Sequence, residues 1–228
     1  MAEDDLQMRI LGVDPGDEVA GARKLYLRTS RGAIPVIMHV AENASRAILC
    51  VCGAIGGFDG PAMLYPRLGL TMPRTGFAVA RMNYRQPNEF DECVLDTLAA
   101  LTFIKGAGHD RVALIGHSFG GAVVINAGTV SPVVTTVVAV SSQLAGAHVI
   151  GELAPKPLLL IHGTADTILS DECSRMLYER AGEPKMLKLF DNADHRLSGH
   201  GDELFNLVQG WIESRLQSPA LPPIDSQF

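Results

Sequence analysis

The stretch that decides the fold is Arg111-Val-Ala-Leu-Ile-Gly-His-Ser-Phe-Gly-Gly121. Its apolar first half, residues 111–115, predicts a buried strand, and the small residues that follow predict a sharp turn into a helix. The turn matches the pattern G-x-S-x-G, with Ser118 at its centre. Glycines two residues before and two after such a serine remove side chains that would clash where the chain reverses. We therefore expect Ser118 to stand on a strained turn between a strand and a helix.

Apolar runs alternate with helix-like segments on both sides of this stretch. Ser30-Arg-Gly32 predicts a turn between two antiparallel strands, and the first 20 residues are polar and irregular, so no element is expected there. Alternating strands and helices predict an α/β fold with a mostly parallel central sheet, an antiparallel N-terminal edge hairpin and helices on both faces. The expected strands are 25–28, 34–40, 47–52, 77–82, 111–115, 133–140, 157–161 and 186–190, and the expected helices are 89–105, 171–181 (capped by Ser170) and 202–216.

Length and composition indicate one globular domain. The chain has 228 residues, of which 47% are hydrophobic and 19% charged, which excludes a disordered protein. We expect a single domain over residues 1–217 and an extended tail over 218–228, where Ser218-Pro-Ala-Leu-Pro-Pro223 lies. Residues 141–156, between two expected strands, are too few to form an additional helical domain.

Charge and cysteine content limit the classes of partner and compartment. The net charge of −6 gives no general attraction to nucleic acid or to an anionic membrane. The longest uncharged apolar stretch, residues 47–58, is too short to span a bilayer. Four cysteines do not form a disulfide framework. Because residues 1–5 are acidic and resemble no secretory leader, we expect a cytoplasmic protein.

Two stretches downstream of Ser118 offer the groups that a serine nucleophile needs, a base and a carboxylate that orients the base. Asp166 ends the turn His162-Gly-Thr-Ala-Asp166, and His195 ends the loop Asp191-Asn-Ala-Asp-His195. Each stretch directly follows an expected strand. The carboxyl ends of parallel strands meet at one edge of a sheet, where ligands bind. We therefore expect Ser118, Asp166 and His195 to meet at that edge.

These three motifs, in this order, resemble the α/β-hydrolase superfamily over roughly residues 22–216. Many members of the superfamily carry a helical lid domain after the strand that is here residues 133–140. The 16 residues 141–156 are too few for one, and in this respect the chain resembles small dienelactone hydrolases and carboxylesterases. The resemblance implies that Ser118 is the nucleophile, His195 the general base and acid, and Asp166 its orienting partner. Dienelactone hydrolases usually carry cysteine at the nucleophile position, whereas serine favours esters, thioesters or amides.

The resemblance also implies an oxyanion hole made of two backbone N–H groups. One is that of Phe119, the residue after the nucleophile. The other is assigned to Ala54, in the glycine-rich loop that follows the strand at residues 47–52. Many members of the superfamily begin this loop with His-Gly, and this chain departs from them with Cys52-Gly53.

Other histidines and carboxylates near the motifs are expected to play smaller parts. His117 is expected to pack beside the serine, and His162 to shape the turn before Asp166. His200 is a further candidate base. Asp191 and Asp194 are further candidate acids, although a residue adjacent to a histidine rarely reaches its ring nitrogen.

The function expected from these residues is that of a serine hydrolase of carboxylesterase or thioesterase type, acting on a small-molecule acyl substrate. An acyltransferase or a cofactor-free perhydrolase would use the same residues. A non-catalytic ligand-binding protein of the same fold is a third alternative. No cofactor and no metal site is expected, since H-E-x-x-H, paired Cys-x-x-Cys and Walker A patterns are absent from the sequence. The sequence leaves a homodimer open.

Overall fold

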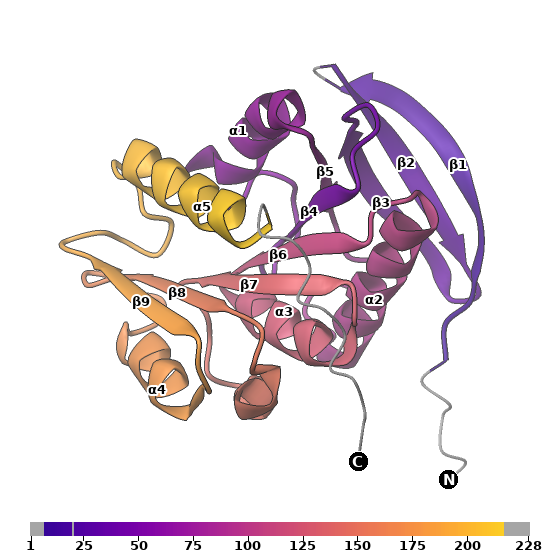
Figure 1. Ribbon diagram of the computed structural model, residues 1–228. Coiled ribbons are helices and arrows are strands. Elements are labelled where there is room, and N and C mark those ends of the chain that lie inside the picture. Colours follow the sequence, from indigo (N-terminus) through magenta and orange to yellow (C-terminus); the bar gives the residue numbers. More distant parts are fainter. Residues whose placement is uncertain (1–6, 20, 217–228) are drawn as a thin grey trace, which may run out of the picture.

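The computed structural model describes residues 7–19 and 21–216 (Figure 1). They form one nine-stranded sheet in the order β1-β2-β3-β5-β4-β6-β7-β8-β9. Strands β4 to β9 run parallel to one another, and β1, β2 and β3 join antiparallel at one edge, where β3 pairs with β5. The strands are β1 Ile10–Val19, β2 Ala22–Thr29, β3 Gly32–His39, β4 Arg46–Val51, β5 Phe77–Met82, β6 Arg111–His117, β7 Val134–Val140, β8 Leu158–Gly163 and β9 Lys185–Phe190.

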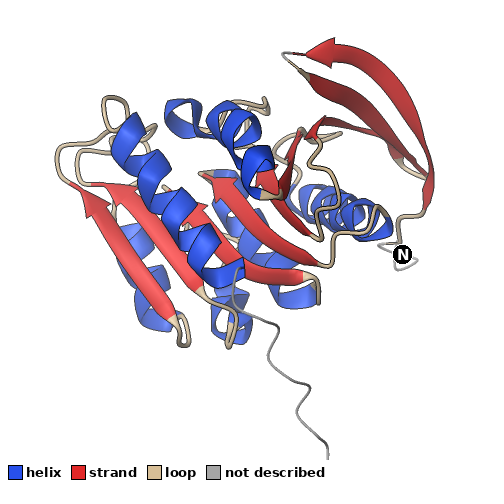
Figure 2. Cartoon of the chain, turned by 45° about the horizontal axis from the view of Figure 1, so that its top comes forward, coloured by secondary structure: helices blue, strands red, loops and turns tan. Residues whose placement is uncertain are grey.

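Helices cover both faces of this sheet, as Figures 1 and 2 show. The helices α1 Leu64–Thr71 and α5 Gly201–Leu216 pack on one face, and α2 Phe90–Gly106, α3 Phe119–Val130 and α4 Glu172–Arg180 pack on the other. Short 3₁₀ turns lie at Pro61–Met63, Met72–Thr75 and His148–Leu153. The predicted fold class, a mostly parallel sheet between two helical layers, is therefore confirmed.

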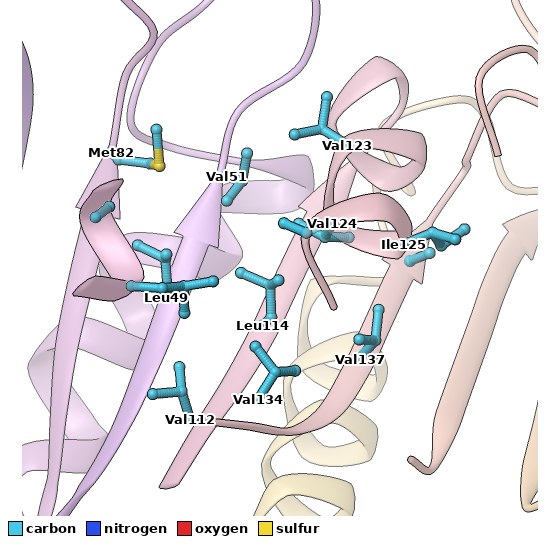
Figure 3. Close-up of a cluster of buried hydrophobic side chains, with 14 of the residues drawn as sticks. Leu49, Val51, Met82, Val112, Leu114, Val123, Val124, Ile125, Val134 and Val137 are labelled. Atoms are coloured by element: carbon cyan, nitrogen blue, oxygen red, sulfur yellow. The ribbon is translucent and has the colours of Figure 1, made fainter. Parts of the chain in front are cut away.

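The central strands are apolar throughout because the two layers bury both of their faces. Leu49, Leu114 and Val137 point from β4, β6 and β7 toward Val124 of α3 (Figure 3). Neighbouring side chains on the same strands, such as Ile48, point toward the opposite layer. Successive side chains point alternately into the two buried clusters, so neither face of a central strand is polar. This double burial fixes the strands whose carboxyl ends carry the candidate site.

The N-terminal edge differs from the expectation, because β1 occupies part of the segment that was expected to be irregular. It pairs antiparallel with β2, with register shifts between Ile10 and Gly12 and between Pro15 and Glu18. Its side chains are mostly exposed on both sides of the ribbon, so the segment shows no alternation of apolar and polar residues. Proline inside it is compatible with an edge strand, whose outer N–H groups need no partner. The expected hairpin is therefore present as β2 and β3, and β1 extends it to a three-stranded ribbon.

Helix α1 was not predicted from the sequence either. Its eight residues include Pro66 in the first turn, where proline is tolerated, and Gly69. A Cβ at Gly69 would lie only 2.4 Å from the His39 ring, so this glycine permits the close approach of α1 to β3. Because α1 is short and its Gly69 is required by the contact with β3, the sequence shows too little helical hydrophobic periodicity to predict it.

Element ends differ from the predictions by at most three residues, the largest difference being the start of β2 at Ala22 rather than at residue 25. Cys52, expected to end a strand, lies just beyond β4, in the loop that lines the candidate site. The N-cap of α4 is Asp171 rather than Ser170, whose hydroxyl instead accepts the N–H of Glu172 at 3.3 Å. The short turn His148–Leu153 is the helical element between β7 and β8.

The expected tail over 218–228 lies outside the described residues. None of the described helices has the length and apolarity to cross a bilayer.

A buried ion-pair network fastens the N-terminal ribbon to α2. Arg85 bonds to Asp96 at 2.5 Å and to Glu92 at 2.6 Å, and Glu92 also pairs with Arg31 of the β2–β3 turn. The side chains of Arg85 and Asp96 are 4% and 0% exposed. Loss of one partner from such a pair leaves an uncompensated buried charge.

We expect Arg85→Leu to lower the free energy of unfolding by about 3 kcal/mol or more, because Asp96 would stay buried without its ion-pair and hydrogen-bond partner. The matched control is Arg28→Leu, which breaks an ion pair to Asp14 whose side chains are both 51% exposed. That exposed pair should contribute less than about 1 kcal/mol. Urea denaturation measures both values, and equal losses would contradict a dominant role for the buried network.

Candidate active site

Ser118 occupies the sharp turn between β6 and α3, with φ 58° and ψ −122°. This backbone conformation is strained for a residue with a side chain. A Cβ at Gly116 would lie 2.1 Å from the carbonyl oxygen of Gly120, and a Cβ at Gly120 would lie 2.1 Å from that of Cys52. The two glycines of the pattern are therefore required by backbone contacts, and the strain holds the Ser118 hydroxyl clear of the sheet.

The structure brings Ser118, His195 and Asp166 together at the carboxyl edge of the sheet. His195 Nε2 lies 3.0 Å from Ser118 Oγ, and His195 Nδ1 lies 2.7 Å from Asp166 Oδ2. Asp166 follows β8 and His195 follows β9. The three side chains thus form one continuous chain of hydrogen bonds across three loops.

The hydrogen-bond partners assign the protons in this chain. An ionised carboxylate only accepts, so His195 Nδ1 donates to Asp166 and the Nε2 lone pair accepts the Ser118 hydroxyl. Burial acts to raise the pKa of Asp166, but N–H donors from Leu169, His195 and Ile168 together hold that pKa below its usual value. Asp166 is therefore an anion at neutral pH.

The other candidate histidines and acids take different places. His117 Nε2 bonds to the backbone carbonyl of His195 at 3.0 Å, with the two rings 4.9 Å apart. His200 packs edge-on against Phe190. The Asp194 carboxylate accepts the backbone N–H groups of Arg196 and Ser198, which folds the histidine loop. His117 thus bonds to the backbone of His195, whereas Asp194 bonds to the backbone of the residues that follow His195.

A cavity of about 490 Å³ opens above Ser118, between the loop of residues 52–60 on one side and Ile168, His195 and Arg196 on the other. Ala54 lines it, and Gly53 approaches so closely that a Cβ there would lie 3.6 Å from Ser118 Cβ. Phe119 is the first residue of α3. Within the described chain, no acceptor bonds to the backbone N–H of Ala54 or of Phe119. Both groups are free to receive a ligand oxygen.

Two side chains that the sequence did not single out for this role hold the loop of residues 52–60. The buried Tyr84 hydroxyl donates to the Cys52 carbonyl at 3.0 Å, and Asn83 Oδ1 accepts the N–H of Gly57 at 3.2 Å. Both residues directly follow β5. The signal that could have found them is the change from apolar to polar residues at the carboxyl end of a buried strand.

The described residues also line a larger cavity, of about 610 Å³, with Ser45 and His109 in its wall. Ser45 precedes β4, so this cavity lies at the amino ends of the strands, away from Ser118. Size alone therefore does not identify the site. Among the described residues, no group of three or more His, Cys, Asp or Glu side chains is arranged to hold a metal ion.

We expect Gly116→Ala to lower the free energy of unfolding by about 2 kcal/mol or more, because the added methyl group overlaps the Gly120 carbonyl. Gly210→Ala in α5 is the matched control, since no atom lies within 4 Å of a Cβ there. The control should raise stability by about 0.5–1 kcal/mol. Thermal unfolding measures the stability of both variants. Equal stability of Gly116→Ala and Gly210→Ala would contradict the steric account of the turn.

His117 should make the fold sensitive to acid. Burial is the main cause that lowers its pKa from 6.5 to about 4. The unfolded chain therefore takes up a proton at His117 in this window while the folded chain does not, so stability falls as the pH falls from 6.5 to 4. The difference reaches about 3 kcal/mol at pH 4.

His117→Gln keeps an amide donor for the His195 carbonyl but does not titrate. We expect this variant to lose less stability than the natural protein between pH 7 and pH 4, by up to about 3 kcal/mol. Urea denaturation at a series of pH values measures the difference. Parallel stability curves for the two proteins would show that His117 is not the buried neutral group described above.

Comparisons with known proteins agree with this architecture. No protein-family model matches the chain. Two relatives, both named uncharacterized protein YfhR, from Escherichia coli O157:H7 and K12, are 26% identical, with 91% and 82% of this chain and 85% and 76% of the relatives covered.

Solved structures of esterases and hydrolases share the fold at low sequence identity. Est1E from Butyrivibrio proteoclasticus has a TM-score of 0.73 at 14% identity, covering 87% of this chain and 100% of that chain. A dienelactone hydrolase from Anabaena variabilis has a TM-score of 0.72 at 16% identity, covering 88% and 98%. An alpha-beta serine hydrolase homologue from Coxiella burnetii has a TM-score of 0.71 at 19% identity, covering 84% and 98%. The chain therefore has the α/β-hydrolase fold.

Proposed function

We propose that this protein is a serine hydrolase that cleaves carboxylic esters or thioesters through an acyl-enzyme on Ser118. The observation that carries the proposal is the hydrogen-bond chain from Ser118 Oγ through His195 to Asp166, with distances of 3.0 and 2.7 Å. The Ser118 end of this row of hydrogen bonds faces a cavity of about 490 Å³ that a small substrate can enter. A hydroxyl bonded to a base that is itself oriented by a carboxylate is the arrangement that activates serine.

In the first half of the proposed reaction, Ser118 Oγ attacks the substrate carbonyl carbon as its proton passes to His195 Nε2. The carbonyl π electrons move to oxygen, and the N–H groups of Ala54 and Phe119 stabilise that charge. The tetrahedral intermediate collapses as the bond to the leaving oxygen or sulfur breaks. His195 gives its proton to the leaving group, so an alcohol or thiol departs and the acyl group stays on Ser118.

In the second half, water replaces the leaving group. His195 takes a proton from water as the water oxygen attacks the acyl carbon, and it returns the proton to Ser118 Oγ when the ester bond breaks. Asp166 remains ionised and stabilises the imidazolium that forms in each half. These steps consume one water molecule and release one carboxylic acid, and they use no metal or cofactor.

The walls of the cavity favour a substrate with an apolar acyl group. Ile55 and Ile168 line it while 91% and 70% exposed, an unfavourable position for large aliphatic side chains unless an apolar group covers them. The backbone of the loop of residues 52–60 supplies most of the remaining wall, with Arg196 among the side chains. Water can enter the cavity of about 490 Å³ and reach the acyl-enzyme, as the proposed hydrolysis requires.

The test is covalent labelling with a fluorophosphonate probe, together with hydrolysis of a p-nitrophenyl ester. Ser118→Ala should abolish labelling, and both Ser118→Ala and His195→Ala should reduce ester turnover about 10⁴-fold or more, because each removes a member of one catalytic unit. The matched control is Ser45→Ala, which alters the serine of the larger cavity and should keep full labelling and turnover. Labelling that survives Ser118→Ala or vanishes in Ser45→Ala would overturn the assignment, and an unlabelled, folded natural protein would favour the non-catalytic alternative.

A further inference from the structure

A second histidine contacts the same carboxylate oxygen as His195. His162, in β8, is fully buried, and its Nε2 lies 3.1 Å from Asp166 Oδ2 and 3.0 Å from the carbonyl oxygen of Leu169. Its other nitrogen, Nδ1, lies 2.7 Å from the hydroxyl of Ser174, at the start of α4. The side chains therefore continue the hydrogen-bond chain beyond Asp166, in the order Ser118, His195, Asp166, His162, Ser174.

The partners of His162 fix where its proton lies. The Leu169 carbonyl can only accept, so Nε2 carries a proton and donates to both Leu169 and Asp166. In the neutral ring, Nδ1 is then an acceptor, and the Ser174 hydroxyl donates to it. His162 thus presents an N–H to Asp166 and has no contact with Ser118, which makes it a neighbour of the acid rather than a second base.

This N–H completes the set of donors around Asp166. Oδ1 accepts the backbone N–H groups of Ile168 at 2.8 Å and Leu169 at 2.9 Å, while Oδ2 accepts His195 and His162. An ionised carboxylate offers about four acceptor positions. All four are therefore used, and any rotation of the carboxylate would break at least one of these bonds.

The backbone around Asp166 is already fixed by contacts that do not involve His162. Thr164 N–H donates to the Phe190 carbonyl at 2.9 Å, and Ala165 N–H donates to the Ala193 carbonyl at 3.0 Å. A Cβ at Gly163 would lie 2.3 Å from the same Ala193 oxygen, which shows how closely this turn packs on the histidine loop. With the backbone fixed, the Asp166 side chain can still rotate, and the hydrogen bond from His162 restricts that rotation.

We propose that His162 is a positioning residue that holds the Asp166 carboxylate in the single orientation in which Oδ2 receives the His195 N–H. The proposal deepens the function proposed above and rests on it. Ser174 fixes the His162 ring from behind, so a buried Ser–His pair supports the acid from the side opposite the reacting serine. A loss of this support leaves the three catalytic groups present but poorly aligned, which lowers the rate of the chemical step more than substrate binding.

The test compares His162→Leu, which removes the donor, with His162→Gln, whose amide can donate near the place of Nε2. We expect His162→Leu to lower kcat about 10- to 100-fold with little change in KM, and His162→Gln to recover most of that loss. The control is Trp211→Phe, which removes the buried 2.9 Å hydrogen bond from Trp211 Nε1 to Thr136 near the amino end of β7. This control should lower the unfolding temperature and leave kcat unchanged. A His162→Leu protein with natural kcat, or a Gln variant as slow as the Leu variant, would overturn the proposal.

A second readout separates this proposal from the proposed function. The proton between His195 Nδ1 and Asp166 should give a low-field proton NMR signal that requires no substrate. We expect the signal to persist in the natural protein, in His162→Gln and in Trp211→Phe, and to shift or broaden in folded His162→Leu. If the natural protein shows no Ser118-dependent turnover but the signal behaves in this way, the proposed function fails while the positioning role stands. A signal unchanged in His162→Leu overturns the positioning role whatever the activity.

Discussion

The partly buried hydrogen bond between Asp166 and His195 is the interaction on which the candidate site depends. It joins the loop after β8 to the loop after β9, across 29 residues of sequence. The two loops meet because Gly163 leaves room for the backbone of Ala193. Once they meet, His195 faces the strained turn after β6, and the Ser118 hydroxyl needs no further movement to reach it. The parallel sheet supplies the common edge, and the glycines supply the close approach.

The three histidines around this edge differ in how deeply they are buried and in what their ring nitrogens contact. His195 keeps one side open to the cavity, where a substrate and water can reach Nε2. His117 lies behind it, and burial is the main cause that lowers its pKa to about 4, so it stays neutral and serves as a fixed donor to a backbone carbonyl. His162 is enclosed by Asp166, Leu169 and Ser174. The surroundings, rather than the residue type, therefore separate the histidine proposed to transfer protons from the two proposed to hold position.

The sequence predicted the parts of this arrangement that repeat a general rule. Long apolar runs marked the central strands because both faces of these strands are buried, and the glycines around Ser118 marked a turn that no other residue would permit. Chain order then predicted that Asp166 and His195 would lie at the same edge as Ser118. Their catalytic roles remain part of the proposed function.

What the sequence did not predict depends on contacts between segments far apart in the chain. Strand β1 has no buried face, so it lacks periodicity, and α1 is short and shaped by its contact with His39. Tyr84 takes its position from the carbonyl of Cys52, 32 residues away in the sequence, a partner that no local pattern identifies. Buried polar side chains of this kind become visible only when the hydrogen bonds of each loop are followed to their ends.

The most direct measurement of the central claim is a crystal structure of the protein after reaction with a small phosphonate ester. The account predicts phosphorus bonded to Ser118 Oγ, a phosphoryl oxygen within hydrogen-bond distance of the N–H groups of Phe119 and Ala54, and His195 still bonded to Asp166. The absence of an adduct at Ser118 in a protein whose fold is intact would contradict the claim. So would a phosphoryl oxygen that points away from both N–H groups.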